Sequence, residues 1–134
     1  LADADKSIGQ CDIFKEITPE EYCEAPCMFR RDGKYHFMWS AGGWGDDTYR
    51  VLTATVEKPW HKPENARTVL KSDYAVAKSP GHNGYIEDTD GQYYIVYHRR
   101  PLDRTMRHCR SLAIDKMDFD ENGNIRNITM TKGE

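Results

Sequence analysis

The sequence has no long apolar run, no excess of basic charge and no cysteine pattern typical of zinc. Since a membrane-spanning helix needs roughly 18 consecutive apolar residues, no segment is predicted to cross a membrane. The chain carries 19 Lys and Arg against 22 Asp and Glu, with a formal net charge of -3. A nucleic-acid surface needs clustered basic residues in excess, so nucleic acid is not an expected partner. We assign the one local basic run, residues 99–110, to a binding-site or structural role.

The four cysteines do not form a metal-ligand set. Cys23 and Cys27 are close in sequence, but no second pair of Cys or His completes four tetrahedral zinc ligands with Cys11 or Cys109. Buried free thiols are the preferred interpretation.

The N-terminal segment also lacks familiar signals. There is no initiator Met and no basic segment followed by an apolar one, as a signal peptide would have, so we expect this sequence to be cut from a longer chain. The cellular location cannot be read from this end. Residues 1–20 are predicted to be a connecting segment from a preceding unit, with a short strand near residues 12–17 and one helical turn at residues 18–21.

The clearest positive signal is a β-hairpin that begins at Glu24. An apolar run, residues 25–29, precedes the turn Asp32-Gly33, and aromatic residues alternate with other residues over 34–40. Further strands are predicted at residues 49–56 and 68–71. Helical periodicity is absent.

The same arrangement returns later in the chain. His82 opens a second unit, the turn Asp90-Gly91 follows, and alternation resumes over residues 92–98. Strands are then predicted at residues 109–114 and 125–130. The two units keep a constant offset, since the separation in sequence of Glu24 and His82 equals that of Gly33 and Gly91. A fixed offset with shared turn chemistry indicates an internal repeat.

Two units of four antiparallel strands favour an all-β fold made of β-propeller blades, since each unit has the size of a blade. The predicted organisation is one incomplete domain, with one blade in residues 21–75 and a second in residues 76–134. A β-sandwich is the alternative, although a sandwich need not repeat its turn positions. Because the first strand of each blade faces the central channel, Glu24 and His82 are predicted to occupy equivalent places at the axis.

Glu24 and His82 are the candidate functional residues. A glutamate at the mouth of a channel, beside Pro26 and Met28, is expected to have a raised pKa and so to keep a proton near neutral pH. The alternative for Glu24 is an exposed carboxylate at a strand start. For His82 the two interpretations are a cation or substrate contact and a hydrogen-bonded histidine at a strand end.

Four segments together resemble the C-terminal part of a glycoside hydrolase family 43 enzyme, namely residues 24–35, residues 40–44, Gly81-His82-Asn83-Gly84 and residues 94–100. This family contains arabinofuranosidases, β-xylosidases and arabinanases. The resemblance covers about Phe14 to Thr131. It implies a five-bladed β-propeller, of which this chain contains the last two blades, and a polysaccharide or oligosaccharide substrate.

The resemblance also implies roles for particular residues. Glu24 matches the general acid that protonates the leaving glycosidic oxygen, and His82 matches a histidine beside a channel metal, usually Ca²⁺. Arg107, and next Arg110, are candidates to contact the sugar. Trp44 is a candidate at the mouth of the channel, as is Tyr49, although turn and core roles are favoured for both.

The family's general base and the aspartate that tunes the acid have no match in this sequence. An inverting hydrolase needs both carboxylates, so the 134 residues alone are expected to be inactive. The missing N-terminal blades, or other copies of the chain, are the expected partners that complete the ring. Two rival hypotheses remain: a propeller that binds a polysaccharide or protein without catalysis, and a structural unit that associates through its open blade edges.

Overall fold

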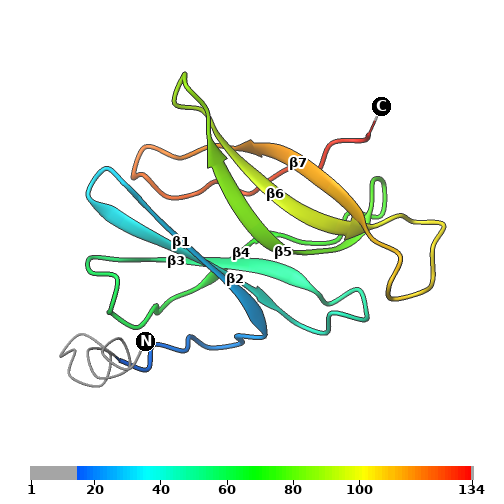
Figure 1. Cartoon of the computed structure of the whole chain (residues 1–134), viewed down its shortest axis with the longest axis horizontal. Helices are drawn as coiled ribbons and strands as arrows, with labels where there is room; N and C mark the ends of the chain where they lie inside the picture. The colour runs from blue at the N-terminus through cyan, green and yellow to red at the C-terminus, as the bar shows by residue number, and fades with distance from the viewer. Residues whose placement is uncertain (1–14, 134) are drawn as a thin grey trace, which may run out of the picture.

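The computed structural model describes residues 15–133, which form two antiparallel sheets packed against each other (Figure 1). The first sheet has the order β1 (Glu24–Arg31), β2 (Lys34–Ala41), β3 (Arg50–Val56) and β4 (Arg67–Leu70), and the second has the order β5 (Lys78–Glu87), β6 (Tyr93–Arg100) and β7 (Ser111–Met117). No helix forms within the described residues, which confirms the all-β prediction. Over residues 15–133, therefore, no helix is long and apolar enough to cross a membrane.

Each sheet is a simple meander in which every strand pairs with its neighbour in the chain. A β-sandwich of the immunoglobulin type would instead contain Greek-key connections. The first sheet lies within residues 21–75 and the second within residues 76–134. The meander order is that of two successive propeller blades.

The predicted strand at residues 125–130 does not form. Ile125 makes an isolated bridge with Phe119, and the Ile128 amide donates a hydrogen bond of 2.8 Å to the Val69 carbonyl of the first sheet. Ile125 and Met130 are buried in the core. The apolar pattern of this segment therefore reflects burial against both sheets, and the second sheet has three strands among the described residues, one fewer than predicted.

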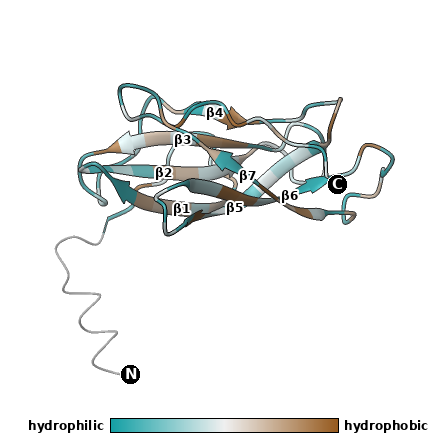
Figure 2. Ribbon diagram, turned by 90° about the horizontal axis from the view of Figure 1, so that it is seen from above, coloured by the Kyte–Doolittle hydropathy of each residue, from teal (hydrophilic) through white to brown (hydrophobic). Residues whose placement is uncertain are grey.

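The core lies between the two sheets and is built mainly from strand residues, to which Ala77, Ile125 and Met130 are added from outside the strands. Figure 2 shows hydrophobic stretches within β1 and β4. The buried members are Phe29, Met38, Val51, Val69, Leu70, Ala77, Tyr93, Ile95, Tyr97, Met117, Ile125 and Met130. A second cluster, on the opposite face of the first sheet, contains Phe37, Trp39, Ala41, Leu52 and Ala54. The first sheet is thus apolar on both faces, as a blade between two neighbours must be.

The two hairpins differ by one residue at their turns. Four residues separate the pair Arg30 and Tyr35 in the first hairpin, whereas five separate Glu87 and Tyr93 in the second. Tyr35 on β2 and Tyr93 on β6 are therefore 58 residues apart, whereas Arg30 on β1 and Glu87 on β5 are 57 residues apart. The predicted equivalence of Glu24 and His82 is therefore wrong by one position.

By register, Glu24 corresponds to Gly81, because they pair with Ser40 and His98 respectively. His82 corresponds to Ala25, and both residues have a positive φ, 52° and 58°. Each lies in a register shift that interrupts the ladder at the start of its strand. Such bulges redirect side chains, so the two strand starts can turn toward each other despite the offset.

Two local elements were predicted at the N-terminal end of the chain. The predicted strand at residues 12–17 falls mostly outside the described residues, and residues 15–17 are not in a strand. In place of the predicted helical turn, the Thr18 amide and hydroxyl both bond to the Glu16 carboxylate, and only a turn forms at Glu20 and Glu21. Thr18 thus bonds to the Glu16 carboxylate instead of capping a helical turn.

The cysteines within residues 15–133 are free. Cys27 and Cys109 are half-buried, and burial raises the pKa of the Cys27 thiol. Cys23 is exposed, contrary to the prediction of buried thiols, because it precedes β1 and lies outside the core. Cys11 lies outside the described residues.

Candidate active site

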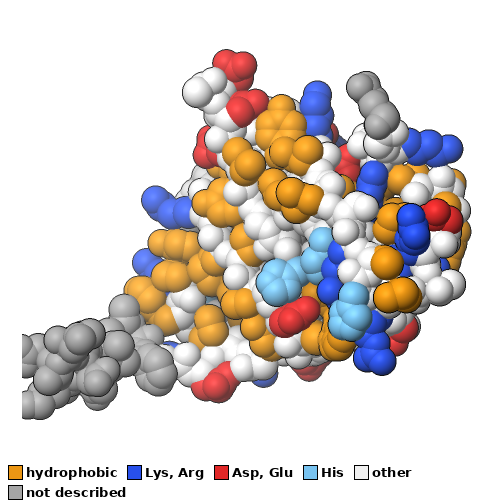
Figure 3. All heavy atoms as spheres, turned by 45° about the vertical axis from the view of Figure 1, so that its right-hand side comes forward, with side chains coloured by type: hydrophobic (Ala, Val, Ile, Leu, Met, Phe, Trp, Pro, Cys, Tyr) orange, Lys and Arg blue, Asp and Glu red, His pale blue; other side chains and the backbone are white. Residues whose placement is uncertain are grey.

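The candidate acid, Glu24, lies where the two sheets meet at one end of the molecule. Its Oε1 accepts a hydrogen bond of 2.6 Å from the Tyr49 hydroxyl and lies 3.5 Å from Nδ1 of His82. The side chain of Glu24 is 40% exposed. Figure 3 shows histidine side chains beside a carboxylate on one face of the molecule. The structure thus brings the two predicted residues together and adds a third, Tyr49.

The Tyr49 ring is fixed by the second sheet. It is fully buried and stacks on the His98 ring, with centroids 5.7 Å apart and planes inclined by 4°. A Cβ on Gly81 would lie 2.0 Å from Cε1 of Tyr49, so only glycine fits at that position. The Gly81-His82 pair therefore has a physical explanation: glycine makes room for the tyrosine, and histidine reaches the carboxylate that the tyrosine holds.

His82 is held by its backbone as well as by its neighbours. Its amide donates a hydrogen bond of 2.8 Å to Oγ of buried Ser40. Its ring centroid lies 6.1 Å from that of His98. Burial lowers the pKa of His98 to about 4, so this histidine is neutral near neutral pH. The site therefore combines a carboxylate, a phenol and two imidazoles.

The pKa of Glu24 is lowered rather than raised as predicted. The hydrogen bond from Tyr49 has the largest effect, the charge and hydrogen bonding of His82 act in the same direction, and burial opposes them. Hydrogen bonds to a carboxylate stabilise its charged form, and in this chain they outweigh desolvation of a carboxyl group that is still partly exposed.

The candidate sugar-binding residues form one cluster. The guanidinium carbons of Arg107 and Arg110 lie 5.4 Å and 5.3 Å from the centre of the Trp44 ring, and His108 stacks at an inclined angle on the same indole. Arg110 also donates a hydrogen bond of 3.3 Å to the Trp44 carbonyl. Two loops, residues 42–49 and residues 101–110, are joined by these contacts.

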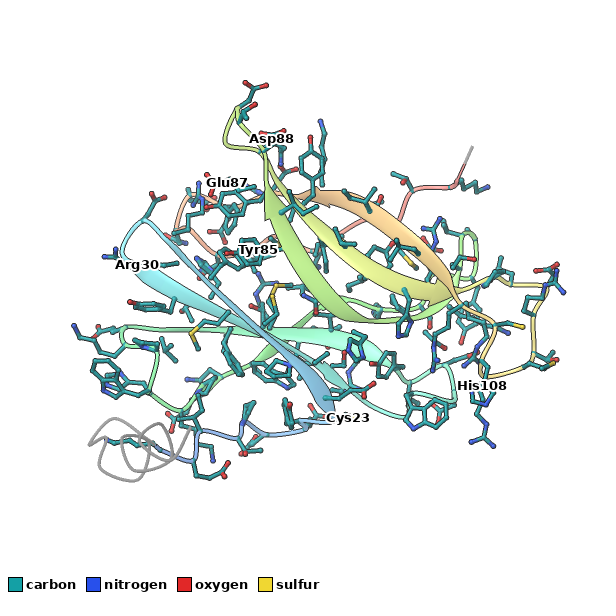
Figure 4. The ribbon with its side chains drawn as sticks, in the orientation of Figure 1. Cys23, Arg30, Tyr85, Glu87, Asp88 and His108 are labelled. Carbon is teal, nitrogen blue, oxygen red and sulfur yellow. The ribbon has the colours of Figure 1, made fainter. Side chains whose placement is uncertain are left out.

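This cluster lies at the same end of the molecule as Glu24. In Figure 4, Cys23, the residue before Glu24, and His108 lie in the lower right part of the view, whereas Arg30, Tyr85, Glu87 and Asp88 lie in the upper left part. A hollow of about 560 Å³ beside the cluster is lined by Gly45, Asp46, Thr105, Met106, Arg107 and His108. The predicted acid and the predicted sugar contacts thus share one end, and the hairpin turns occupy the other.

The described residues do not fit a Ca²⁺ site by themselves. Ca²⁺ takes six to eight oxygen ligands. Within residues 15–133 no group of three His, Cys, Asp or Glu side chains has an arrangement that could hold a metal ion. His82 offers a nitrogen, and Oε1 of Glu24 is already engaged by Tyr49. Residues 15–133 therefore supply no calcium cage.

Sequence reasoning assigned Tyr49 mainly to the core and did not single out His98. Tyr49 is fully buried, as the alternation predicted over residues 49–56 indicates, whereas His98 is only partly buried and falls out of step with the buried residues Tyr93 and Tyr97. The internal repeat could have pointed to His98. By register His98 is equivalent to Ser40, and the two residues pair with Gly81 and Glu24 at the strand starts.

Residues 2–125 match the family model described as glycosyl hydrolases family 43. Since the match covers most of the 134 residues, this chain belongs to that family. The family assignment made from the four sequence segments is confirmed.

Curated relatives agree with this assignment. The chain is 41% identical over 119 residues to a protein named beta-D-galactofuranosidase xynD of Aspergillus niger, a match that covers 88% of this chain and 35% of the relative. A protein named beta-xylosidase of Xylanibacter ruminicola is 24% identical over 82% of this chain and 32% of its own length. The chain thus spans about a third of the length of these relatives.

Solved structures share the fold. An endo-1,4-beta-xylanase from Bacteroides thetaiotaomicron superposes with a TM-score of 0.69 at 22% identity, over 81% of this chain and 38% of that one. The alpha-L-arabinanase of Cellvibrio cellulosa gives a TM-score of 0.68 at 20% identity, over 79% and 36%. The two sheets are therefore about two blades of a five-bladed β-propeller, as predicted.

Proposed function

We propose that the natural protein hydrolyses α-L-arabinofuranosyl or β-xylosyl linkages of plant polysaccharides with inversion, and that Glu24 is its general acid. The observation that carries the proposal is the Glu24 carboxyl group, held at one end of a family 43 chain by Tyr49 and His82. The name of the Aspergillus niger relative adds the β-D-galactofuranosyl linkage to the candidates.

In this proposal the proton of Glu24 passes to the glycosidic oxygen as the bond to the sugar breaks. The attacking water needs a second carboxylate about 6.5 to 9.5 Å from the acid. The groups that act on the pKa of Glu24 through charge or hydrogen bonds are Tyr49, His82 and His98, none of which is a carboxylate. The base would then come from the missing blades or from another copy of the chain, and residues 1–134 alone would be inactive.

The lowered pKa of Glu24 also fits a protein in which further blades complete the active site. A general acid works best with a pKa near the operating pH. Further blades would cover the exposed part of Glu24 and, with a nearby aspartate, would raise its pKa by desolvation and like charge. A Ca²⁺ near His82 would likewise need oxygen ligands from water or from other blades.

Arg107, Arg110 and Trp44 are proposed to contact the substrate. Residues 15–133 contain no carboxylate within ion-pair distance of Arg107 or Arg110, so both guanidinium groups have donors available for sugar hydroxyls. Trp44 is partly exposed and offers an apolar surface beside them.

The test compares leaving groups. Glu24→Gln in the natural full-length protein is expected to lower kcat/KM by roughly 10²- to 10⁴-fold on oligosaccharides, whose leaving group needs protonation. The loss should be much smaller on nitrophenyl arabinofuranoside, xyloside or galactofuranoside, because nitrophenolate leaves without a proton. Glu21→Gln, three residues earlier, is the control and should leave both rates unchanged.

Equal losses on both substrate types would contradict the role of Glu24 as acid. If the wild-type protein hydrolyses none of these substrates yet binds the polysaccharide, the non-catalytic binding function replaces this proposal. Normal hydrolysis by residues 1–134 alone would show that the base is not missing.

A further inference from the structure

We propose that Tyr49 is the positioning residue of the acid: its hydroxyl holds Oε1 of Glu24, so that Oε2 is the oxygen that carries the transferred proton. This inference rests on the proposed role of Glu24 and concerns a residue outside the predicted catalytic set.

The two oxygens of Glu24 have different surroundings. Both contacts of the carboxyl group, the Tyr49 hydroxyl at 2.6 Å and Nδ1 of His82 at 3.5 Å, are made by Oε1. Within residues 15–133 no hydrogen bond or ion pair reaches Oε2. The carbonyl oxygen of a protonated carboxyl group is a stronger acceptor than its hydroxyl oxygen, so the hydrogen bond from the phenol to Oε1 favours the protonated form of Glu24 that holds the proton on Oε2.

The donor keeps its own proton over the working range of pH. Burial raises the pKa of Tyr49 far above its ordinary value, and the hydrogen bond to Glu24 adds to the increase. Tyr49 therefore donates to Oε1 whether Glu24 is charged or neutral. The carboxyl group can lose its proton to a substrate and regain one without rotating.

The donor is also immobile. The Tyr49 ring is fully buried, stacks on His98, and fills the space that a side chain at residue 81 would occupy. A hydrogen bond from such a ring fixes the direction of its acceptor far better than one from a mobile surface side chain. Because small displacements of reacting groups cost large factors in rate, a fixed acid is catalytically valuable.

A second tyrosine shows what a purely structural bond of this kind looks like. The Tyr97 hydroxyl donates to Oδ2 of Asp115 at 2.6 Å, but Oδ1 of Asp115 is occupied by the Thr131 amide and hydroxyl. Asp115 is buried and both of its oxygens have partners. Glu24, by contrast, is held through one oxygen, and its side chain is partly open to solvent.

The experiment compares Tyr49→Phe with Tyr97→Phe, which removes a matched hydroxyl away from Glu24. In the natural full-length protein, Tyr49→Phe is expected to lower kcat by about 10- to 100-fold with little change in KM. Because the lost hydrogen bond lowers the pKa of Glu24, its removal should move the alkaline limb of the pH–rate profile to higher pH. Tyr97→Phe should move neither quantity.

A second readout does not depend on activity. The titration of the Glu24 side-chain carboxyl carbon, followed by ¹³C NMR in residues 1–134, should shift to higher pH in Tyr49→Phe and stay in place in Tyr97→Phe. An unchanged titration in Tyr49→Phe, or an equal shift in both variants, would overturn the positioning role of Tyr49 but leave the proposed function intact. Full activity of Glu24→Gln on oligosaccharides would instead overturn the proposed function.

Discussion

Gly81 determines whether Tyr49 can reach Glu24. Gly81→Ala places a Cβ 2.0 Å from the Tyr49 ring, which is already fixed on its other side by His98. Overpacking of this kind costs about 1 to 3 kcal/mol, so we expect that loss in the unfolding free energy measured by urea denaturation. Gly84→Ala is the control, since a Cβ there meets no atom within 4 Å. Similar losses in both variants would refute the steric explanation.

His36 makes the stability of the fold depend on pH. It is 1% exposed, neither ring nitrogen has a hydrogen-bond partner, and it stacks on Phe29. Burial lowers the pKa of His36 from 6.5 to about 4, so between these values the unfolded chain binds a proton that the folded chain does not. Stability should therefore be highest above pH 6.5 and fall as the pH drops, by up to about 3 kcal/mol near pH 4.

The measurement is urea denaturation of residues 1–134 at pH 7 and at pH 5, a range in which carboxylates with lowered pKa values stay charged. His36→Phe keeps the aromatic contact and removes the titrating group, so its loss of stability between these pH values should be smaller. His98 titrates in the same range and leaves a residual loss. Identical pH dependence in wild type and His36→Phe would contradict the assignment.

At the residue scale, sequence reasoning found Glu24 and His82 through their motifs. It did not find the contact between them, because the constant offset between the two units hid the extra residue at the second turn. Sequence reasoning also did not predict that the pKa of Glu24 is lowered, because the decrease depends on a hydrogen bond from Tyr49, 25 positions away in sequence.

The loop between β2 and β3 is anchored by an ion pair between buried Arg100 and Asp47, whose side chain is 38% exposed. Arg100 is almost fully buried, its Nη1 lies 3.7 Å from Oδ1 of Asp47, and its Nε and Nη2 have no protein partner. The Tyr74 hydroxyl bonds to the other oxygen of Asp47. The loop so anchored carries Trp44 and leads directly into Tyr49, so both ends of the candidate site depend on it.

Asp47→Ala leaves the buried Arg100 charge without its partner. Because Asp47 itself is partly exposed, we expect a loss of about 1 to 3 kcal/mol in the unfolding free energy. The double variant Asp47→Ala/Arg100→Met removes both charges and should recover most of that loss, as a double-mutant cycle in urea would measure. Purely additive effects of the two substitutions would indicate that the pair is not coupled.

At the element scale, the sequence predicted seven strands near their observed places. Turn chemistry and alternation are local properties, so they can be read without the fold. Residues 125–130 were assigned to a strand because an extended segment buried against two sheets has the same apolar pattern. Only the tertiary contact of Ile128 with Val69 separates the two cases.

For the whole molecule, the outer face of the second sheet is the open surface. By register, Ile86, Val96, Ile114 and Leu112 share this face. Leu112 is 81% exposed and Ile114 is 54% exposed. A propeller would cover this face with a neighbouring blade. The chain spans only about a third of its relatives' length, so this face is uncovered in residues 15–133.

Residues 1–134 alone should therefore self-associate through this face. We expect sedimentation velocity to show association that increases with concentration, and Leu112→Lys/Ile114→Lys to abolish it while changing the unfolding free energy by less than about 0.5 kcal/mol. Met106→Lys, an exposed apolar residue on the loop between β6 and β7, is the control and should still associate. A wild-type chain that stays monomeric at high concentration would contradict this prediction.

The unequal hairpin turns offer a practical use. The second turn carries an additional residue, yet both sheets regain the same pairing beyond it. A Cβ on Gly33 or on Gly91 would meet no atom within 4 Å. In Figure 4, Arg30 near the first tip and Asp88 at the second lie on the opposite side of the molecule from His108. A fluorescent dye or a short affinity tag inserted at either tip would thus report on the protein without reaching the residues around Glu24.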